Sequence, residues 1–192
     1  MTPKLKIIMG PMFSGKSTEL IRLIRREKVI TDNILVIKPI IDNRYSSDHI
    51  CSHDYDKVKC ITTENLNSVK NLSEWEKAEV IFIDEAQFFT GLYNFVLENL
   101  EQFNKSIIVV GLDGDYKRKP FGEILQLIPI ADNVTKLTSY CNFCKDGTNG
   151  IFTLRLNNSQ NQELVGGSEI YKSVCRNHYN LLKQITTNNI IV

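Results

Sequence analysis

Short apolar runs alternate with longer amphipathic stretches through the first two thirds of the chain. The apolar runs are rich in β-branched side chains and lie at residues 5–9, 34–37, 80–83 and 107–110, with a weaker one at 134–137. Apolar side chains recur with a helical period in residues 17–28 and 92–103. Because unbroken β-branched strands that alternate with helices are typical of a sheet covered on both faces, the pattern predicts an α/β fold with a parallel sheet flanked by helices.

Two segments depart from this pattern. Residues 39–60 are polar and show no strong periodicity, so they predict an irregular connection. Residues 139–175 hold three cysteines, a run of asparagine, serine and glutamine, and two adjacent glycines. This composition indicates a small separate unit with a long loop. After residue 184 the chain turns polar and then apolar, which is typical of a terminus with little fixed structure.

Composition excludes several classes of protein. A chain of 192 residues is long enough for one sizeable core with a small appendage. Apolar residues make up 42% of it and the net charge is +1, which excludes a disordered chain and a strongly basic nucleic-acid coat. No apolar run approaches the roughly 20 residues of a membrane span. The N-terminus lacks the long apolar stretch of a secretory signal, so we expect an intracellular protein.

Residues 10–17, GPMFSGKS, match the phosphate-binding pattern G-x-x-x-x-G-K-[ST] between a predicted strand and a predicted helix. In such a P-loop, backbone N–H groups and the helix N-terminus surround phosphates. Lys16 is expected to neutralise the β- and γ-phosphates, and Ser17 to place its hydroxyl on Mg²⁺. The competing interpretation is a glycine-containing turn with a chance lysine, which the strand–loop–helix context disfavours. The candidate ATP-binding residues here are Gly10, Pro11, Met12, Phe13, Ser14, Gly15, Lys16 and Ser17.

Two carboxylates, Asp84 and Glu85, directly follow the apolar run at residues 80–83. Ligands of open α/β sheets bind at that end of the strands. Asp84 suits the Mg²⁺ side of the site, and Glu85 suits a general base on an attacking oxygen. The competing interpretation is an acidic pair that stabilises the start of the next helix. The P-loop upstream favours the metal and base roles.

Two short-spaced pairs, Cys141-x-x-Cys144 and Cys175-x-x-His178, match a closed tetrahedral zinc site. We interpret it as structural, because no further group is evident that would keep a coordination position open. The alternatives are four unrelated residues or a redox pair, and the segment lacks the thioredoxin-like context of the latter.

The remaining cysteines, Cys51 and Cys60, have no such partners and are expected to be plain free thiols. His49 and His53 fall in the irregular segment, where a surface or loop-ordering role is expected. The chain should thus divide into a P-loop NTPase-like α/β domain at residues 1–138, a zinc-containing subdomain with a long lasso loop at 139–180, and a tail at 181–192.

Six motifs in order resemble the type II (cytosolic-type) thymidine kinase family over about residues 5–180. They are GPMFSGKS at 10–17 followed by TELIRLIRR, DNRYS at 42–46 with SHD at 52–54, DEAQFF at 84–89, GLDGDYKRKPFG at 111–122, VTKL at 134–137 and VGGSEIYKSVC at 165–175. Two positions depart from the pattern common in animal members. Ala86 stands where those members have a glycine, and His178 stands where they have a cysteine. Histidine also binds zinc, so the metal site is kept.

The resemblance implies transfer of the ATP γ-phosphate to the 5′-hydroxyl of thymidine. By motif, Glu85 would deprotonate that hydroxyl and Asp84 would support Mg²⁺. Asp42 and Arg44 would help to orient the phosphates and the metal, and Arg118 would lie near the nucleotide phosphates.

The resemblance also implies a nucleoside pocket with aromatic walls and a loop whose backbone holds the thymine. The implied pocket residues are Met12, Gln87, Phe88, Leu112, Tyr116, Phe121, Thr153, Tyr171 and the loop residues Gln162, Glu163, Leu164, Val165 and Gly166. Phe88 and Phe121 have an alternative interpretation as core aromatics, since aromatic residues pack cores more often than they line sites.

The resemblance alone further implies a homotetramer and feedback inhibition by thymidine triphosphate. The near-neutral charge and the lack of a spanning or signal segment lead us to expect a cytoplasmic protein with no nucleic-acid or membrane partner. Two competing functions remain open at this point. One is a P-loop ATPase or switch whose zinc unit binds nucleic acid, because the P-loop is shared by many functions. The other is a kinase for deoxyuridine or another pyrimidine nucleoside.

Overall fold

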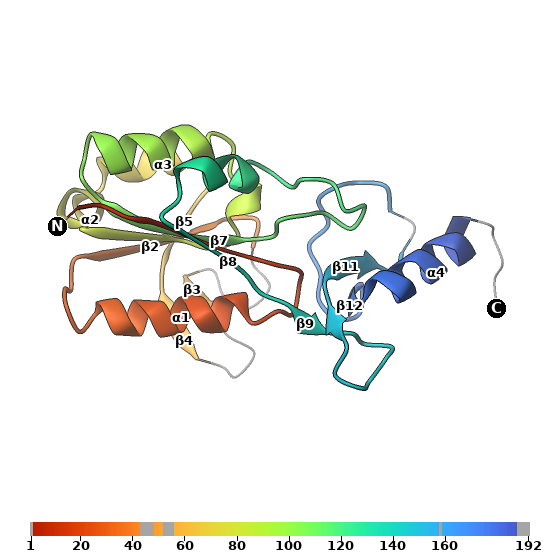
Figure 1. The fold of residues 1–192 in the computed structure, drawn as a ribbon. Helices are drawn as coiled ribbons and strands as arrows, with labels where there is room; N and C mark the ends of the chain where they lie inside the picture. The colour runs from red at the N-terminus through yellow and green to blue at the C-terminus, as the bar shows by residue number, and fades with distance from the viewer. Residues whose placement is uncertain (1, 43–47, 52–55, 158, 188–192) are drawn as a thin grey trace.

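Six parallel strands form the central sheet of the computed structural model, which describes residues 2–42, 48–51, 56–157 and 159–187 (Figure 1). Their order across the sheet is β5-β2-β6-β7-β1-β8. The strands are β1 (Leu5–Met9), β2 (Ile34–Pro39), β5 (Ile61–Thr63), β6 (Val80–Ile83), β7 (Ser106–Gly111) and β8 (Asn133–Lys136). Every pairing within this sheet is parallel, which confirms the fold predicted from the sequence.

Apolar layers cover both faces of the sheet, because successive side chains of a strand point to opposite faces. Ile7 belongs to the cluster under helix α3 (Leu92–Glu101), whereas its neighbour Ile8 belongs to the cluster under helix α1 (Lys16–Glu27). Figure 1 shows α1 on one side of the sheet and α3 on the other. This double cover explains why the central strands read as continuous apolar runs.

The segment at residues 39–60, expected to be irregular, contains two short strands. Strands β3 (His49–Cys51) and β4 (Lys57–Lys59) pair antiparallel. Ile50 and Cys60 are buried in the cluster under α1, and burial raises the pKa of the Cys60 thiol to about 12. The expectation was wrong because three-residue strands are too short to show a period in sequence. Cys60 is accordingly a protonated, buried thiol, as expected.

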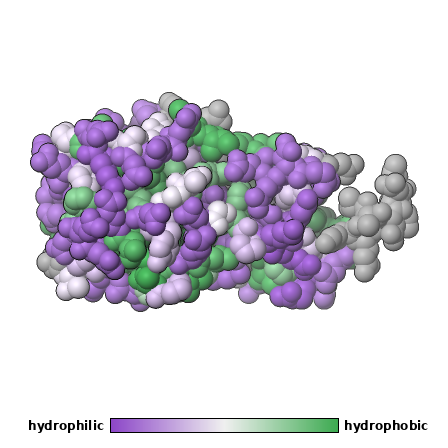
Figure 2. All heavy atoms as spheres, turned by 90° about the horizontal axis from the view of Figure 1, so that it is seen from above, coloured by the Kyte–Doolittle hydropathy of each residue, from purple (hydrophilic) through white to green (hydrophobic). Residues whose placement is uncertain are grey.

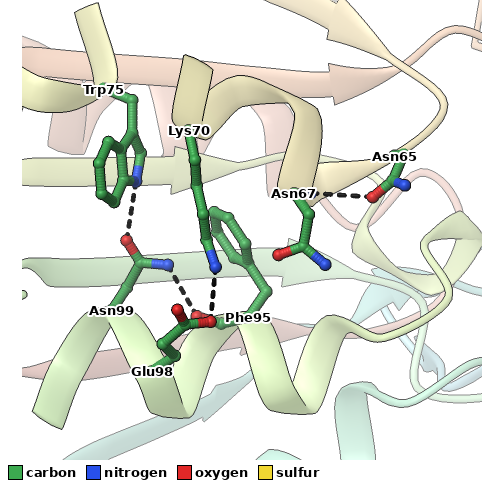
Figure 3. A network of polar contacts seen from close by, with 7 residues as sticks. All are labelled: Asn65, Asn67, Lys70, Trp75, Phe95, Glu98 and Asn99. Carbon is green, nitrogen blue, oxygen red and sulfur yellow. Dashed lines mark hydrogen bonds and ion pairs between the residues drawn. The ribbon is translucent and has the colours of Figure 1, made fainter. Parts of the chain in front are cut away.

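Additional short helices complete the outer layer beside α3. They are η1 (Leu66–Asn71), α2 (Ser73–Lys77), η2 (Ala86–Phe88) and η3 (Ile124–Ile130). A polar network ties η1 and α2 to α3 (Figure 3): the indole N–H of Trp75 donates to Asn99 Oδ1 at 2.9 Å, and Lys70 pairs with Glu98 at 2.5 Å. Asn99 is fully buried and donates to the Phe95 carbonyl at 2.8 Å, so both ends of its buried amide have a hydrogen-bond partner.

Two antiparallel ribbons and a helix follow β8, at the right of the sheet in Figure 1. The ribbons are β9 (Ser139–Tyr140) with β10 (Asn149–Gly150), and β11 (Phe152–Arg155) with β12 (Tyr171–Val174). Helix α4 (Arg176–Thr187) continues across the tail boundary expected at residue 181. Its sequence holds no glycine or proline that would end the helix there.

The surface is polar over most of the face seen in Figure 2, where apolar side chains form small separated groups. Within the described part of the chain, no helix combines the length and the apolar character needed to cross a membrane.

Candidate active site

A large open cavity lies where the sheet meets the two C-terminal ribbons. Its volume is about 1050 Å³, including the solvent at its mouth. Most of its lining comes from four parts of the chain: the P-loop with the start of α1, the turn after β6, the segment at residues 112–121, and residues 153–171. Asp42 and Cys51 also line it. Of the predicted pocket residues it is lined by Met12, Gln87, Phe88, Leu112, Tyr116, Phe121, Thr153, Gln162, Leu164, Val165, Gly166 and Tyr171.

The P-loop forms a closed turn around its own lysine. The Lys16 ammonium is buried and donates to the Pro11 carbonyl at 2.8 Å, and the Ser14 hydroxyl donates to the same carbonyl at 2.8 Å. Gly10 has φ +152°, and a Cβ there would lie 2.4 Å from the Leu137 carbonyl oxygen, so only glycine fits. The P-loop residues that line the cavity, besides Met12, are Phe13, Ser14, Gly15, Lys16 and Ser17. Gly10 and Pro11 belong to the loop but do not line the cavity.

The backbone of Met12 is held on both sides by the C-terminal ribbon. Its N–H donates to Thr153 Oγ1 at 3.0 Å, and its carbonyl accepts from Ser173 Oγ at 2.6 Å. Thr153 on β11 and Ser173 on β12 are both buried and are partners in the ribbon register. The ribbon therefore fixes one edge of the P-loop, and with it the mouth of the cavity.

The turn after β6 presents the two predicted carboxylates. Asp84 is buried, and its backbone N–H donates to the Ile37 carbonyl of β2 at 2.9 Å. It lines a small hollow of about 260 Å³ together with Ser17, Asp42 and the buried Lys38. The sheet thus gathers one hydroxyl and two carboxylates from three separate segments, as ligands of Mg²⁺ would be.

Glu85 adopts a left-handed backbone conformation, with φ +46° and ψ +42°, and lines the main cavity. This region is sparsely populated for a residue with a side chain and is common at functional sites. The Gln87 amide donates to Glu85 Oε2 at 2.6 Å, and Gln87 Oε1 accepts from the Leu112 N–H at 2.9 Å. A Cβ on Gly111 would lie 2.4 Å from Gln87 Oε1, so glycine is needed for this amide to bridge the two segments.

Aromatic rings form one wall of the cavity. Phe88 and Phe121 meet edge to face with centroids 5.4 Å apart. Phe121 is buried and Phe88 is half-buried, yet both line the cavity. The two interpretations of these residues, core and pocket, are therefore compatible, because the pocket wall is the end of the core.

Two charged residues of the cavity were not identified from the sequence. Asp115 is buried and accepts from the Lys117 and Lys119 N–H groups and from the Gln162 side chain, at 2.8, 2.9 and 2.9 Å. Arg155 is 8% exposed and its guanidinium lies 3.7 Å from the Tyr116 ring centroid. The available signal for Arg155 was a lone arginine in an otherwise strand-like stretch, and for Asp115 its place in a quoted motif.

Some predicted site residues lie elsewhere. The Arg118 guanidinium packs over the Tyr179 ring at 4.2 Å and donates to Asn180, so it faces α4. Glu163 is exposed on the loop and is not part of the cavity wall. Arg44 and His53 lie outside the described residues. The half-buried His49, expected to have a surface or loop-ordering role, pairs with Asp48 and also lines the small hollow beside Asp84. The phosphate roles of Arg44 and Arg118 stay predictions.

The four predicted metal ligands come together between β9, β12 and α4. The ligand atoms of Cys141, Cys144, Cys175 and His178 all lie within 4.8 Å of one another. His178 Nδ1 is 3.3 Å from the sulfurs of Cys144 and Cys175 and 3.6 Å from that of Cys141. A tetrahedron with Zn–S near 2.3 Å and Zn–N near 2.0 Å has edges of about 3.5–3.8 Å, so the donor set fits zinc.

The electrostatics of this cluster favour a thiolate at Cys141, whereas burial and the contacts with Cys141 and Cys175 raise the pKa of the Cys144 thiol to about 11. Burial raises the pKa of the Cys141 thiol, but hydrogen bonds from the backbone N–H groups of Cys175, Cys144 and Phe143 outweigh burial and lower it to about 6. Metal ligands must be deprotonated, so the backbone prepares this sulfur for a cation. A small apolar core that includes Val174 and Tyr179 surrounds the cluster.

Comparison with known proteins agrees with this geometry. A family profile described as "Thymidine kinase" matches residues 3–179. "Thymidine kinase a" of Arabidopsis thaliana is 44% identical over 189 residues, 97% of this chain and 76% of that protein. "Thymidine kinase, cytosolic" of Homo sapiens is 42% identical over 90% of this chain and 71% of its own length. "Thymidine kinase" of Oryza sativa subsp. japonica is 42% identical over 92% of this chain, which spans 66% of the rice protein.

The Met12 anchor can be tested at Thr153. In Thr153→Val the Met12 N–H loses its acceptor at almost unchanged volume, which should lower the free energy of unfolding by about 1–3 kcal/mol. Thr153→Ser keeps the hydroxyl and serves as the matched control, with a loss well below that of the valine variant. Thermal or denaturant unfolding measures both, and equal losses in the two variants would contradict the anchor.

Proposed function

The chain belongs to the thymidine kinase family, and we propose how its site transfers the γ-phosphate of ATP to the 5′-hydroxyl of thymidine. The observation that carries the proposal is the shared cavity. P-loop residues, the Glu85 carboxylate and the aromatic wall of Phe88 and Phe121 all line it. Phosphoryl transfer asks the protein mainly to align donor and acceptor and to neutralise charge, and one cavity that holds both ends meets that demand.

On the nucleotide side, the N–H groups of residues 13–17 and the N-terminus of α1 would surround the β- and γ-phosphates of ATP. The Lys16 ammonium would exchange its bond to the Pro11 carbonyl for phosphate oxygens. Ser17, Asp84 and Asp42 fit Mg²⁺, since their oxygens line one hollow beside the P-loop. When bound, that ion supplies charge neutralisation to the phosphates. Arg44 and Arg118 are proposed as further phosphate contacts on the family resemblance.

On the acceptor side, Glu85 would act as the general base. Its carboxylate accepts the proton of the 5′-hydroxyl while that oxygen attacks the γ-phosphorus. The new P–O bond yields thymidine monophosphate, and the bond from the γ-phosphorus to the bridging oxygen breaks to release ADP. The 2.6 Å hydrogen bond from Gln87 would orient the Glu85 carboxylate toward the acceptor.

Thymine would lie against the aromatic wall beneath the loop at residues 159–167. Met12, Leu112, Tyr116, Thr153 and Tyr171 complete the proposed pocket, with backbone groups of Gln162, Leu164, Val165 and Gly166. Glu163 is included on the family resemblance alone. Backbone recognition is consistent with a loop whose side chains at residues 160–163 are polar and exposed.

We also propose the zinc-containing unit at residues 139–180 as a structural subdomain that covers the nucleoside, beside an α/β domain at 1–138. Zinc would hold β9, β12 and α4 together, because the four ligands come from the turn after β9 and from the junction of β12 with α4. Family resemblance further supports a cytoplasmic homotetramer inhibited by thymidine triphosphate at the nucleoside site, with no nucleic-acid or membrane partner.

The acceptor assignment is tested by a nucleoside screen with ATP and Mg²⁺. Thymidine is expected to give the highest kcat/KM, deoxyuridine a lower value, and purine nucleosides none, because aromatic rings and the loop at residues 159–167 limit the space for the base. Phosphorylated products are separated by chromatography. Faster turnover of deoxycytidine or a purine nucleoside would overturn the assignment, and tight DNA binding without thymidine turnover would favour the ATPase or switch.

The base role is tested by Glu85→Gln. The amide cannot take the proton, so kcat should fall by about 10²- to 10⁴-fold while thymidine binding changes little. Glu64→Gln, an exposed position before η1, is the matched control and should keep the wild-type rate. Steady-state kinetics measure both, and near wild-type turnover in Glu85→Gln would remove Glu85 from the mechanism.

The metal is tested by elemental analysis and chelation. We expect one zinc per chain, lost in Cys144→Ser and kept in Cys51→Ser. Because metal binding is coupled to folding of the unit that holds it, chelation should expose residues 139–178 to proteolysis while the sheet stays folded. A metal-free protein with unchanged melting would contradict a structural role.

A further inference from the structure

One guanidinium, that of Arg155, gathers the backbone of the loop at residues 159–167. This loop has no helix or strand of its own, yet five of its residues line the cavity. Arg155 Nη1 donates to the Ser159 carbonyl at 3.2 Å and to the Asn161 carbonyl. Nη2 donates to the Gln162 carbonyl at 2.9 Å. A loop outside any helix or strand is thus held by a buried cation.

The same guanidinium reaches further along the loop through Tyr171. Nη2 donates to the Tyr171 hydroxyl at 2.8 Å, and that hydroxyl donates to the Leu164 carbonyl at 2.6 Å. Four carbonyls between residues 159 and 164 therefore depend on one side chain. Bonds from a charged donor are about twice as strong as neutral ones, and the planar fork of arginine fixes their directions.

The anchor is tied to the opposite wall of the cavity. The guanidinium lies over the Tyr116 ring at 3.7 Å, and the Tyr116 hydroxyl also donates to the Ser159 carbonyl, at 3.3 Å. The Tyr116 carbonyl in turn accepts from the Tyr179 hydroxyl at 2.7 Å, beside the metal ligand His178. Among the described residues Arg155 Nε has no hydrogen-bond partner, so the terminal nitrogens carry the contacts.

We propose that Arg155 is a positioning residue that forms the nucleoside-binding loop before the nucleoside arrives. The inference rests on the proposed function for what the loop binds, and on the contacts alone for what holds the loop. If the loop is already ordered, nucleoside binding does not include the entropic cost of ordering it, so the affinity is higher. Loss of the fork should therefore weaken acceptor binding and leave the ATP side and the chemical step largely intact.

The test compares Arg155→Lys with Arg176→Lys. Lysine keeps the charge at residue 155 but loses the fork and the flat stack. Arg176 also lies over an aromatic ring, Phe152 at 5.0 Å, but is exposed on α4. In Arg155→Lys the KM for thymidine should rise about 10- to 100-fold, with the KM for ATP and kcat within about threefold of wild type. Arg176→Lys should leave all three unchanged.

A second measurement needs no nucleoside. Glutamyl endopeptidase cuts after Glu163, an exposed loop residue, and cleavage there should be several-fold faster in Arg155→Lys than in wild type. Tyr171→Phe removes one hydroxyl from the anchor and should give an intermediate rate, so it serves if Arg155→Lys fails to fold. Zinc content and melting temperature confirm that each variant is intact.

The two arms separate the two proposals. If wild-type protein does not phosphorylate thymidine, the proposed function fails while the cleavage rates still decide the anchor. Unchanged cleavage after Glu163 in both variants would overturn the anchor. Equal changes in kcat and in both KM values, with wild-type cleavage, would also overturn it, because they would indicate general damage to the site.

Discussion

The structure depends most on the two hydrogen bonds that hold the backbone of one residue, Met12. Its N–H and carbonyl are bonded by Thr153 and Ser173, which come from strands more than 140 residues further along the chain. A P-loop alone binds phosphates but has no acceptor pocket. Because this contact joins the ribbon of β11 and β12 to the P-loop, the loop at residues 159–167 lies over the same cavity as Lys16 and Glu85.

Polar contacts within the cavity follow from that junction. Gln87 donates its amide N–H to Glu85 and accepts the Leu112 N–H with its oxygen, so one side chain joins the turn after β6 to the segment after β7. Arg155 and Tyr116, stacked on each other, both donate to the Ser159 carbonyl of the loop. Buried charged and amide side chains are stable only when they are hydrogen-bonded. These hydrogen bonds make the site rigid where donor and acceptor must be aligned.

Much of the fold could be predicted from particular residues of the sequence. The apolar runs at 5–9, 80–83 and 107–110 became central strands, and the motif at 10–17 became a turn between β1 and α1. The cysteine and histidine spacing placed four ligand atoms together. Strands β3, β4 and β5 could not be predicted, since three residues carry no period and their pairing is non-local. The helical course of α4 past residue 181 was also missed.

The sequence by itself determined the chemistry at each short segment: the P-loop, the acidic pair at 84 and 85, the metal ligands and the family. These are local patterns, in which spacing along the chain fixes spacing in space. Only the tertiary structure decided which distant groups share a cavity, that Arg118 faces Tyr179, and that Arg155 and Asp115 belong to the site. Such contacts depend on packing and hydrogen bonding between residues far apart in the chain. A local sequence pattern therefore does not predict them.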